Sequence, residues 1–265
     1  MRKQVLSAIL LFTFAQLPAF AAQENQDFIQ SSTEAKKIEF YWSKPAGQGP
    51  FPLLLLIHPD QDSPKIGGKV FIEMGQLEYW SKKGFVTVAI SQPGYGASEG
   101  PADFCGPHTQ AAALEVLSFF RAKKELVSKR IFIYGGSRGA VVASMLAAKA
   151  PELSGVILKS GVYNFVEWTR VTSWFNPIKL TLLWEMGWPT EEKLKARSAI
   201  FLADNIKAPT LIIHGTHDSR APLSIAEELS ENINRAGGKA QLVKIDSEHV
   251  IPMTKVNELM ETFMK

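Results

Sequence analysis

The stretch that decides the fold of this chain runs from residue 130 to residue 149 and reads RIFIYGGSRGAVVASMLAAK. It begins with a short apolar run, passes through small residues around Ser137, and continues as an alanine-rich segment of helical character. A strand, a sharp turn that carries a serine, and a helix form the context in which a G-x-S-x-G match predicts a nucleophile elbow. Gly135 and Gly139 fit this prediction, because strand and helix crowd the serine turn and leave no room for side chains there.

Short apolar runs alternate with helical patterns along the rest of the chain. The predicted strands are residues 38–42, 52–57, 85–90, 130–134, 155–159, 209–214 and 240–245. The predicted helices are residues 69–82, 109–125, 222–236 and 253–264, where apolar side chains recur at helical spacing. This α/β alternation is typical of a mostly parallel central sheet with helices on both faces, which binds ligands at the carboxyl ends of its strands.

One segment, at about residues 162–205, interrupts the alternation and holds four of the six tryptophans. It predicts a small helical cap inserted between two strands. Trp168, Trp174 and Trp184 are candidates for an aromatic wall over the active site. The alternative is that these rings only pack the cap onto the sheet.

The first 21 residues have the pattern of a secretory signal peptide. Arg2 and Lys3 precede an apolar run at residues 5–15, and small residues stand at both positions that a signal peptidase recognises before Ala22. We therefore expect export to the periplasm or medium, with cleavage after Ala21 and one α/β domain at residues 22–265. An uncleaved membrane anchor is the alternative, although the run is short for a membrane span.

Composition excludes several classes of protein. The 265 residues are 46% hydrophobic and 21% charged, which is ordinary for a globular domain. Removal of Arg2 and Lys3 with the leader lowers the net charge from +3 to +1, so the charge favours neither nucleic acid nor an anionic membrane as a partner. Cys105 is the single cysteine, so no internal disulfide can form, and no cluster with the spacing of metal ligands is seen.

A serine nucleophile needs a base and an acid that orients the base. When the serine lies on an elbow of this kind, the acid and the histidine follow it in that order, each after a later strand. His249 follows the last predicted strand and is the expected base, whereas His214 ends a strand and His217 shares a turn with the acid. The expected acid is Asp218, directly after the strand at 209–214.

Two other aspartates are weaker candidates for the acid. Asp246 is close in sequence to His249 and is the competitor. Asp204 precedes its strand and so points to the wrong end of the sheet.

The oxyanion formed in such a reaction needs two backbone N–H donors. Arg138, next to the serine, is expected to supply one of them. The other should come from the loop His58-Pro59-Asp60, and because proline has no N–H, Asp60 is the expected donor. Two alternatives for the Asp60 side chain remain, namely accepting a hydrogen bond from a substrate amine or capping the loop.

The glycine-rich segment SQPGYGASEG at residues 91–100 lacks the fingerprint of a phosphate-binding loop. It is interpreted as a structural loop beside the active site, with Tyr95 as a candidate pocket residue.

Several motifs together resemble the α/β hydrolases. They are the elbow GGSRG at 135–139, the loop PGYGAS at 93–98, and the run PTLIIHGTHD at 209–218 that leads to Ala221 and Pro222. RSAI at 197–200 and SGVY at 160–163 are similar to segments of the catalytic domain of prolyl oligopeptidase-like serine hydrolases. The resemblance covers residue 51 to the C-terminus. It implies an α/β-hydrolase fold, acyl chemistry at Ser137, and no metal or organic cofactor.

Three departures from that family shift the expected substrate. The family's peptidases carry an N-terminal β-propeller, for which too few residues precede the first predicted strand. The loop 58–60 replaces the usual His-Gly-Gly, and Arg138 stands where an aromatic residue often follows the nucleophile. We therefore expect an esterase-type serine hydrolase acting on small esters, with a peptidase of short peptides as the first alternative and a non-catalytic, ligand-binding hydrolase fold as the second.

Overall fold

The computed structural model describes residues 24–31, 36–173 and 175–265, and within these residues it forms one eight-stranded sheet. The strand order is β1-β2-β4-β3-β5-β6-β7-β8. The strands are β1 (Asn25–Gln30), β2 (Lys37–Ser43), β3 (Phe51–Ile57), β4 (Val86–Ile90), β5 (Val127–Gly136), β6 (Gly155–Lys159), β7 (Thr210–Gly215) and β8 (Ala240–Ile245). β2 pairs antiparallel with β1 and with β4, and all other neighbours are parallel. The predicted mostly parallel sheet is confirmed.

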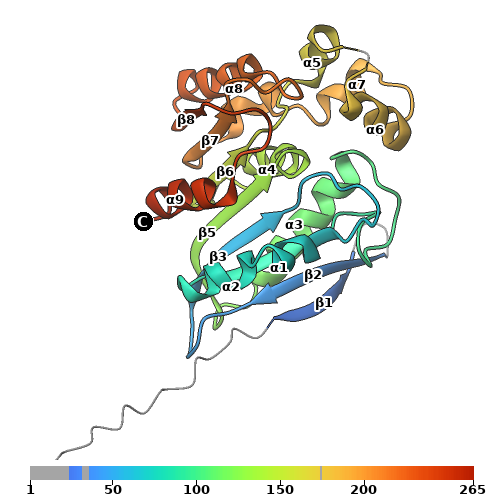
Figure 1. Ribbon diagram of the computed structural model, residues 1–265. Helices are drawn as coiled ribbons and strands as arrows, with labels where there is room; N and C mark the ends of the chain where they lie inside the picture. The colour runs from blue at the N-terminus through green and yellow to red at the C-terminus, as the bar shows by residue number, and fades with distance from the viewer. Residues whose placement is uncertain (1–23, 32–35, 174) are drawn as a thin grey trace, which may run out of the picture.

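Helices cover both faces of the sheet (Figure 1). One face packs against α3 (Pro107–Arg121), α4 (Arg138–Lys149) and α8 (Leu223–Arg235). The other packs against α1 (Val70–Glu73), α2 (Gln76–Lys82) and α9 (Met253–Phe263), and a short 3-10 helix, η1 (Gly67–Lys69), leads into α1. The central strands are therefore buried on both sides, which explains their continuous apolar runs.

Two predictions about elements were wrong. The single helix expected at residues 69–82 is divided into α1 and α2, because Gly75 lies between them in the left-handed region at φ +66°. No strand is predicted before residue 38, yet the structure has β1 there. β1 is an edge strand whose side chains are mostly exposed, so it carries no apolar pattern to reveal it.

A helical segment separates β6 from β7, as the sequence predicts. It consists of α5 (Phe165–Val171), α6 (Pro177–Met186), α7 (Glu191–Lys195) and the 3-10 helix η2 (Ala199–Asn205). Figure 1 shows α5, α6 and α7 gathered beyond one end of the sheet. We call α5, α6 and α7 with their connections the cap.

The carboxyl ends of β5, β7 and β8 meet at one edge of the sheet. In the parallel register Gly136 pairs with Lys159, Lys159 with Ile213, and Gly215 with Ile245. The loops that carry Ser137, Asp218 and His249 therefore start side by side. The predicted leader, residues 1–21, lies outside the described residues, and no helix among those described has the length and apolarity to cross a bilayer.

Candidate active site

Ser137 occupies a sharp turn between β5 and α4. Its backbone has φ 51° and ψ −114°, a conformation that side-chain-bearing residues rarely adopt. The turn requires glycines on both sides, because a Cβ on Gly135 would lie 2.1 Å from the carbonyl oxygen of Gly139. A Cβ on Gly139 would lie 2.0 Å from the carbonyl oxygen of Ile57. The two glycines therefore allow the sharp turn to form and to pack closely against the end of β3.

The structure brings Ser137, His249 and Asp218 into one hydrogen-bonded chain. Ser137 Oγ lies 2.9 Å from His249 Nε2, and His249 Nδ1 lies 2.8 Å from Asp218 Oδ2. A carboxylate only accepts, so Nδ1–H donates to Asp218 and Nε2 is left to accept from the serine hydroxyl. Ser160 Oγ donates to the backbone carbonyl of His249 at 3.0 Å and helps to hold its loop.

The surroundings of Asp218 keep its carboxylate ionised. Burial raises the pKa of this group, but hydrogen bonds from His249 and from the backbone N–H of Ala221 outweigh burial and lower the pKa below its usual value. The N–H groups of Arg220 and Ala221 both donate to Oδ1 at 2.9 Å. The second carboxylate oxygen is thereby left to His249, which it orients.

The other histidines that follow Ser137 and the competing acid Asp246 have closer partners of their own, although His214 Nε2 also lies 3.5 Å from Asp218 Oδ2. His214 is fully buried, and its Nε2–H donates to the carbonyl oxygen of Ala221 at 2.7 Å. His217 and Asp246 are exposed and pair with each other at 2.9 Å. Of the three aspartates considered as the acid, only Asp218 is hydrogen-bonded to His249.

A small pocket opens beside the serine. It is lined by Asp60, Phe104, Ser137, Arg138, Val141, Ser160, Val162, Phe165, Ile178, Ala221 and His249. Six of these side chains are apolar, and they come from α4, from the cap and from the loops that follow β4, β6 and β7. An apolar pocket with a few convergent polar groups is the usual form of a small-molecule site.

Both residues predicted to supply oxyanion donors line this pocket. Arg138 is the first residue of α4, so its N–H has no acceptor within the helix. Asp60 lies in the loop after β3, the strand whose end contacts the elbow through Gly139.

The buried ring of His58 holds the loop that carries Asp60. Its Nδ1–H donates to the carbonyl oxygen of Pro59 at 2.7 Å, and its Nε2 accepts from the backbone N–H of Gln92 at 3.1 Å. Complete burial lowers the pKa of His58 to about 3, so the ring stays neutral and keeps both hydrogen bonds.

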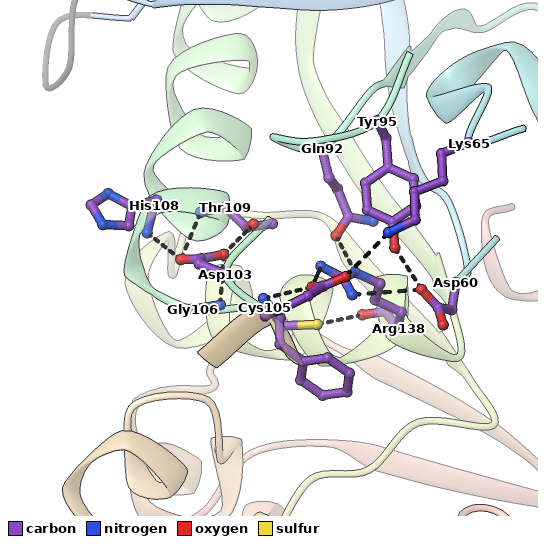
Figure 2. Close-up of polar contacts among 12 residues, drawn as sticks. Asp60, Lys65, Gln92, Tyr95, Asp103, Cys105, Gly106, His108, Thr109 and Arg138 are labelled. Atoms are coloured by element: carbon purple, nitrogen blue, oxygen red, sulfur yellow. Dashed lines mark hydrogen bonds and ion pairs between the residues drawn. The ribbon is translucent and has the colours of Figure 1, made fainter. Parts of the chain in front are cut away.

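The Arg138 side chain joins the elbow to the cap and to the loops around it (Figure 2). Nη2 donates to Glu185 Oε2 on α6 at 2.6 Å, and both side chains are almost fully buried. Nε donates to Gln92 Oε1 at 3.2 Å, while Nη1 lies 3.5 Å from Asp60 Oδ1. The sequence gives no local signal for this network, because Glu185 lies 47 positions from Arg138.

Tyr95 does not line the pocket, contrary to the prediction. It is fully buried, and its hydroxyl donates to Asp60 Oδ1 at 2.5 Å. Its ring packs against His58 and the Arg138 guanidinium. Tyr95 therefore supports the residues that face the pocket.

Of the three tryptophans predicted to form a wall, the two that the structure describes, Trp168 and Trp184, do not line the pocket. Trp168 is fully buried, packs on Phe165, and donates its indole N–H to the carbonyl oxygen of Arg220 at 2.8 Å. Trp184 is 89% exposed on α6, and Trp174 lies outside the described residues. For Trp168 the structure bears out the alternative that the ring packs the cap.

Comparisons with known proteins agree with this architecture. A family model described as "Prolyl oligopeptidase family" matches residues 74–264. The chain is 25% identical over 232 residues to the uncharacterized peptidase YuxL of Bacillus subtilis (strain 168), a match that covers 82% of this chain and 34% of that protein. The chain thus spans about a third of the length of this curated relative.

Two solved structures show the same fold. The acylaminoacyl peptidase of Pyrococcus horikoshii has a TM-score of 0.75 at 19% identity, over 92% of this chain and 41% of that one. The Pyrococcus furiosus esterase Pf2001 has a TM-score of 0.68 at 16% identity, over 92% of this chain and 94% of that one.

Proposed function

This chain belongs to the prolyl oligopeptidase family and is a serine hydrolase, and from that premise we propose that it hydrolyses ester or amide bonds of small substrates through an acyl-enzyme. The observation that carries the proposal is the hydrogen-bonded chain from Ser137 through His249 to Asp218, which opens into the apolar pocket. The elbow geometry of the serine supports it independently.

In the first half of the reaction, Ser137 Oγ attacks the substrate carbonyl while His249 Nε2 takes the hydroxyl proton. The backbone N–H groups of Arg138 and Asp60 stabilise the oxyanion of the tetrahedral intermediate. Collapse of the intermediate breaks the bond to the leaving group, which receives the proton from His249. Asp218 stabilises the imidazolium between the two transfers.

In the second half, water attacks the acyl-enzyme. His249 accepts a proton from that water, and a second oxyanion forms in the same hole. Its collapse releases the carboxylic acid and returns the proton to Ser137. Every proton is moved by a group of this chain, so the steps proposed here need no further reactant than water.

Esters are the first substrate class to propose. An alkoxide leaving group needs less assistance from His249 than an amine does, so the same residues cleave esters more readily than amides. The esterase Pf2001 shares the fold. Cleavage of short peptides is the second candidate, and it is favoured by the family itself and by the acylaminoacyl peptidase among its structural neighbours.

Initial rates on a matched series of nitrophenyl esters and aminoacyl nitroanilides test the proposal. Wild type, Ser137→Ala and the control Ser118→Ala, an exposed serine of α3, are compared. We expect turnover in wild type and Ser118→Ala, and a loss of at least about 10³-fold in Ser137→Ala. Cleavage of esters alone supports the esterase and cleavage of both series supports the peptidase, whereas equal rates in Ser137→Ala refute the mechanism.

Export is a separate part of the proposal, supported by the pattern of residues 1–21. Cell fractionation followed by N-terminal sequencing tests it. A periplasmic or secreted product that begins at Ala22 supports export, and a cytoplasmic product that retains residues 1–21 contradicts it.

A further inference from the structure

Asp60 presents a carboxylate to an otherwise apolar pocket. Its side chain is 40% exposed, whereas that of Arg138, the other charged residue in the lining besides the titratable His249, is 2% exposed. Among the described residues that line the pocket, Asp60 is therefore the one whose formal charge a substrate can reach. The mechanism uses only its backbone N–H, so the carboxylate is unexplained.

The carboxylate is held from one side only. Tyr95 donates its hydroxyl to Oδ1 at 2.5 Å. Burial raises the pKa of Tyr95 far above its ordinary value, so the hydroxyl remains a donor. Within the described part of the chain no hydrogen bond or ion pair engages Oδ2, which leaves that oxygen as an acceptor at the pocket.

Nearby cations neutralise the charge of Asp60 only in part. Arg138 Nη1 is 3.5 Å from Oδ1, and that nitrogen makes no hydrogen bond to any described residue. The close partner of Arg138 is Glu185, at 2.6 Å. Lys65 also approaches Glu185, at 3.5 Å. The guanidinium of Arg138 therefore makes its closest contact with Glu185, and the carboxylate of Asp60 retains negative charge that a substrate cation can bind.

The position of this charge selects a kind of substrate. A carboxylate on the residue that supplies an oxyanion donor repels the negative charge that develops on the substrate carbonyl. An ammonium bound to Asp60 cancels that repulsion and forms a charge-assisted hydrogen bond. In an α-amino acid derivative the ammonium is borne by the carbon next to the carbonyl, while the side chain is free to enter the apolar part of the pocket.

We propose that Asp60 binds the free α-ammonium group of aminoacyl substrates, so that the preferred substrates are esters or amides of unblocked α-amino acids. Phe104, Phe165 and Ile178 form the wall that receives an apolar amino-acid side chain. This inference rests on the proposed function, because it assumes that acyl transfer takes place at Ser137.

The test compares two esters that differ only in the amino group, L-phenylalanine ethyl ester and ethyl 3-phenylpropanoate. We expect wild type to favour the amino ester by at least about tenfold in kcat/KM at pH 6.5. Asp60→Asn, which keeps the side-chain shape and the backbone N–H, should abolish the preference. Asp62→Asn, which removes an exposed carboxylate from the same loop, should keep it.

The pH dependence of the rate ratio gives a second readout. Tyr95, Arg138 and His58 are the ionisable groups that interact with Asp60, and Glu185 and Lys65 lie beyond Arg138. All of them are the same for both esters, so their effects cancel in the ratio of the two rates. The ratio of the rate on the amino ester to the rate on the ester without an amino group therefore depends on the protonation of the substrate amine. It should fall as pH rises past about 7.7, where α-amino groups lose their proton. An equal rate on both esters, or a preference that survives in Asp60→Asn, overturns the inference.

A binding measurement separates this inference from the proposed function. If neither ester is cleaved, the proposed function fails. Calorimetry on Ser137→Ala with L-phenylalanine amide and 3-phenylpropanamide then tests whether Asp60 forms a binding site for the ammonium group. Tighter binding of the amine that disappears in Ser137→Ala/Asp60→Asn supports the ammonium site, and equal or absent binding of the two amides overturns it.

Discussion

Removal of the Glu185 charge should destabilise the protein far more than removal of a surface carboxylate. Glu185 Oε2 accepts from Arg138 Nη2 at 2.6 Å and from the backbone N–H of Phe104 at 3.0 Å. Both charged side chains are 3% exposed or less. Loss of one partner from such a pair leaves the other charge buried, with a typical cost of about 3–5 kcal/mol.

Glu185→Gln keeps the shape of the side chain and an oxygen for Phe104. We therefore expect the lower end of the range, about 3 kcal/mol, since Asp60 at 3.5 Å still offers Arg138 partial compensation. For a domain of this size that loss corresponds to a decrease in Tm of about 6–12 °C. Urea unfolding followed by circular dichroism measures the first quantity, and thermal unfolding measures the second.

The control is Glu227→Gln. Its pair with Lys244 has side chains that are 37% and 51% exposed, so its loss should change stability by less than about 1 kcal/mol. Arg138→Met/Glu185→Leu removes both buried charges and should cost less than the two single changes together. A cost below about 1 kcal/mol for Glu185→Gln would refute the argument that this pair secures the cap.

The remaining predictions concern the acid, the elbow and the buried histidine. Asp218→Asn should lower kcat by about 10³–10⁴-fold in steady-state assays, whereas Asp246→Asn should change it less than about twofold; the reverse order would identify Asp246 as the acid. Gly139→Ala should fail to fold or lose several kcal/mol in urea unfolding, because its Cβ would meet the carbonyl oxygen of Ile57 at 2.0 Å, and wild-type stability would refute the packing argument. The free energy of unfolding should fall by about 1.4 kcal/mol for each pH unit below about 6.5, because the unfolded chain takes up a proton at His58 that the folded state, with a pKa of about 3, does not. Urea unfolding from pH 7 to 5 measures this slope, and His58→Gln should show a shallower one. A free energy of unfolding that does not change with pH in wild type would contradict the prediction.

The fold could be predicted wherever a short stretch of sequence carries the pattern of its secondary structure. Buried parallel strands are apolar runs, and the elbow is a short motif flanked by a strand and a helix. Because the carboxyl ends of parallel strands share one edge, the order of Ser137, Asp218 and His249 along the chain was enough to predict that they meet.

Elements without such signals were missed. β1 is a polar edge strand, held by its antiparallel pairing with β2 and not by apolar burial. The break at Gly75 depends on a positive φ that helical periodicity does not reveal. Trp168 and Trp184 have the same chemistry, yet one is buried and the other exposed, because the tertiary packing of the cap decides which face is covered.

The polar network around Arg138 could not be predicted either. Its contacts to Gln92 and Glu185 span 46 and 47 positions of sequence and depend on how the cap docks. From the sequence, Arg138 and Asp60 are expected to act through their backbone N–H groups, and a substrate amine is only one of two alternative partners of the Asp60 side chain. The structure adds the exposure of the Asp60 carboxylate at the pocket and its contacts with Tyr95 and Arg138, and these carry the inference about substrate charge.

Covalent labelling by a fluorophosphonate tests the central claim, that Ser137 is an activated nucleophile, most directly. Intact mass spectrometry followed by peptide mapping should show one adduct, located on Ser137, which is absent in Ser137→Ala and forms at least about 10³-fold more slowly in His249→Ala. A folded wild-type protein that stays unlabelled, or that carries the adduct on another residue, would contradict the account.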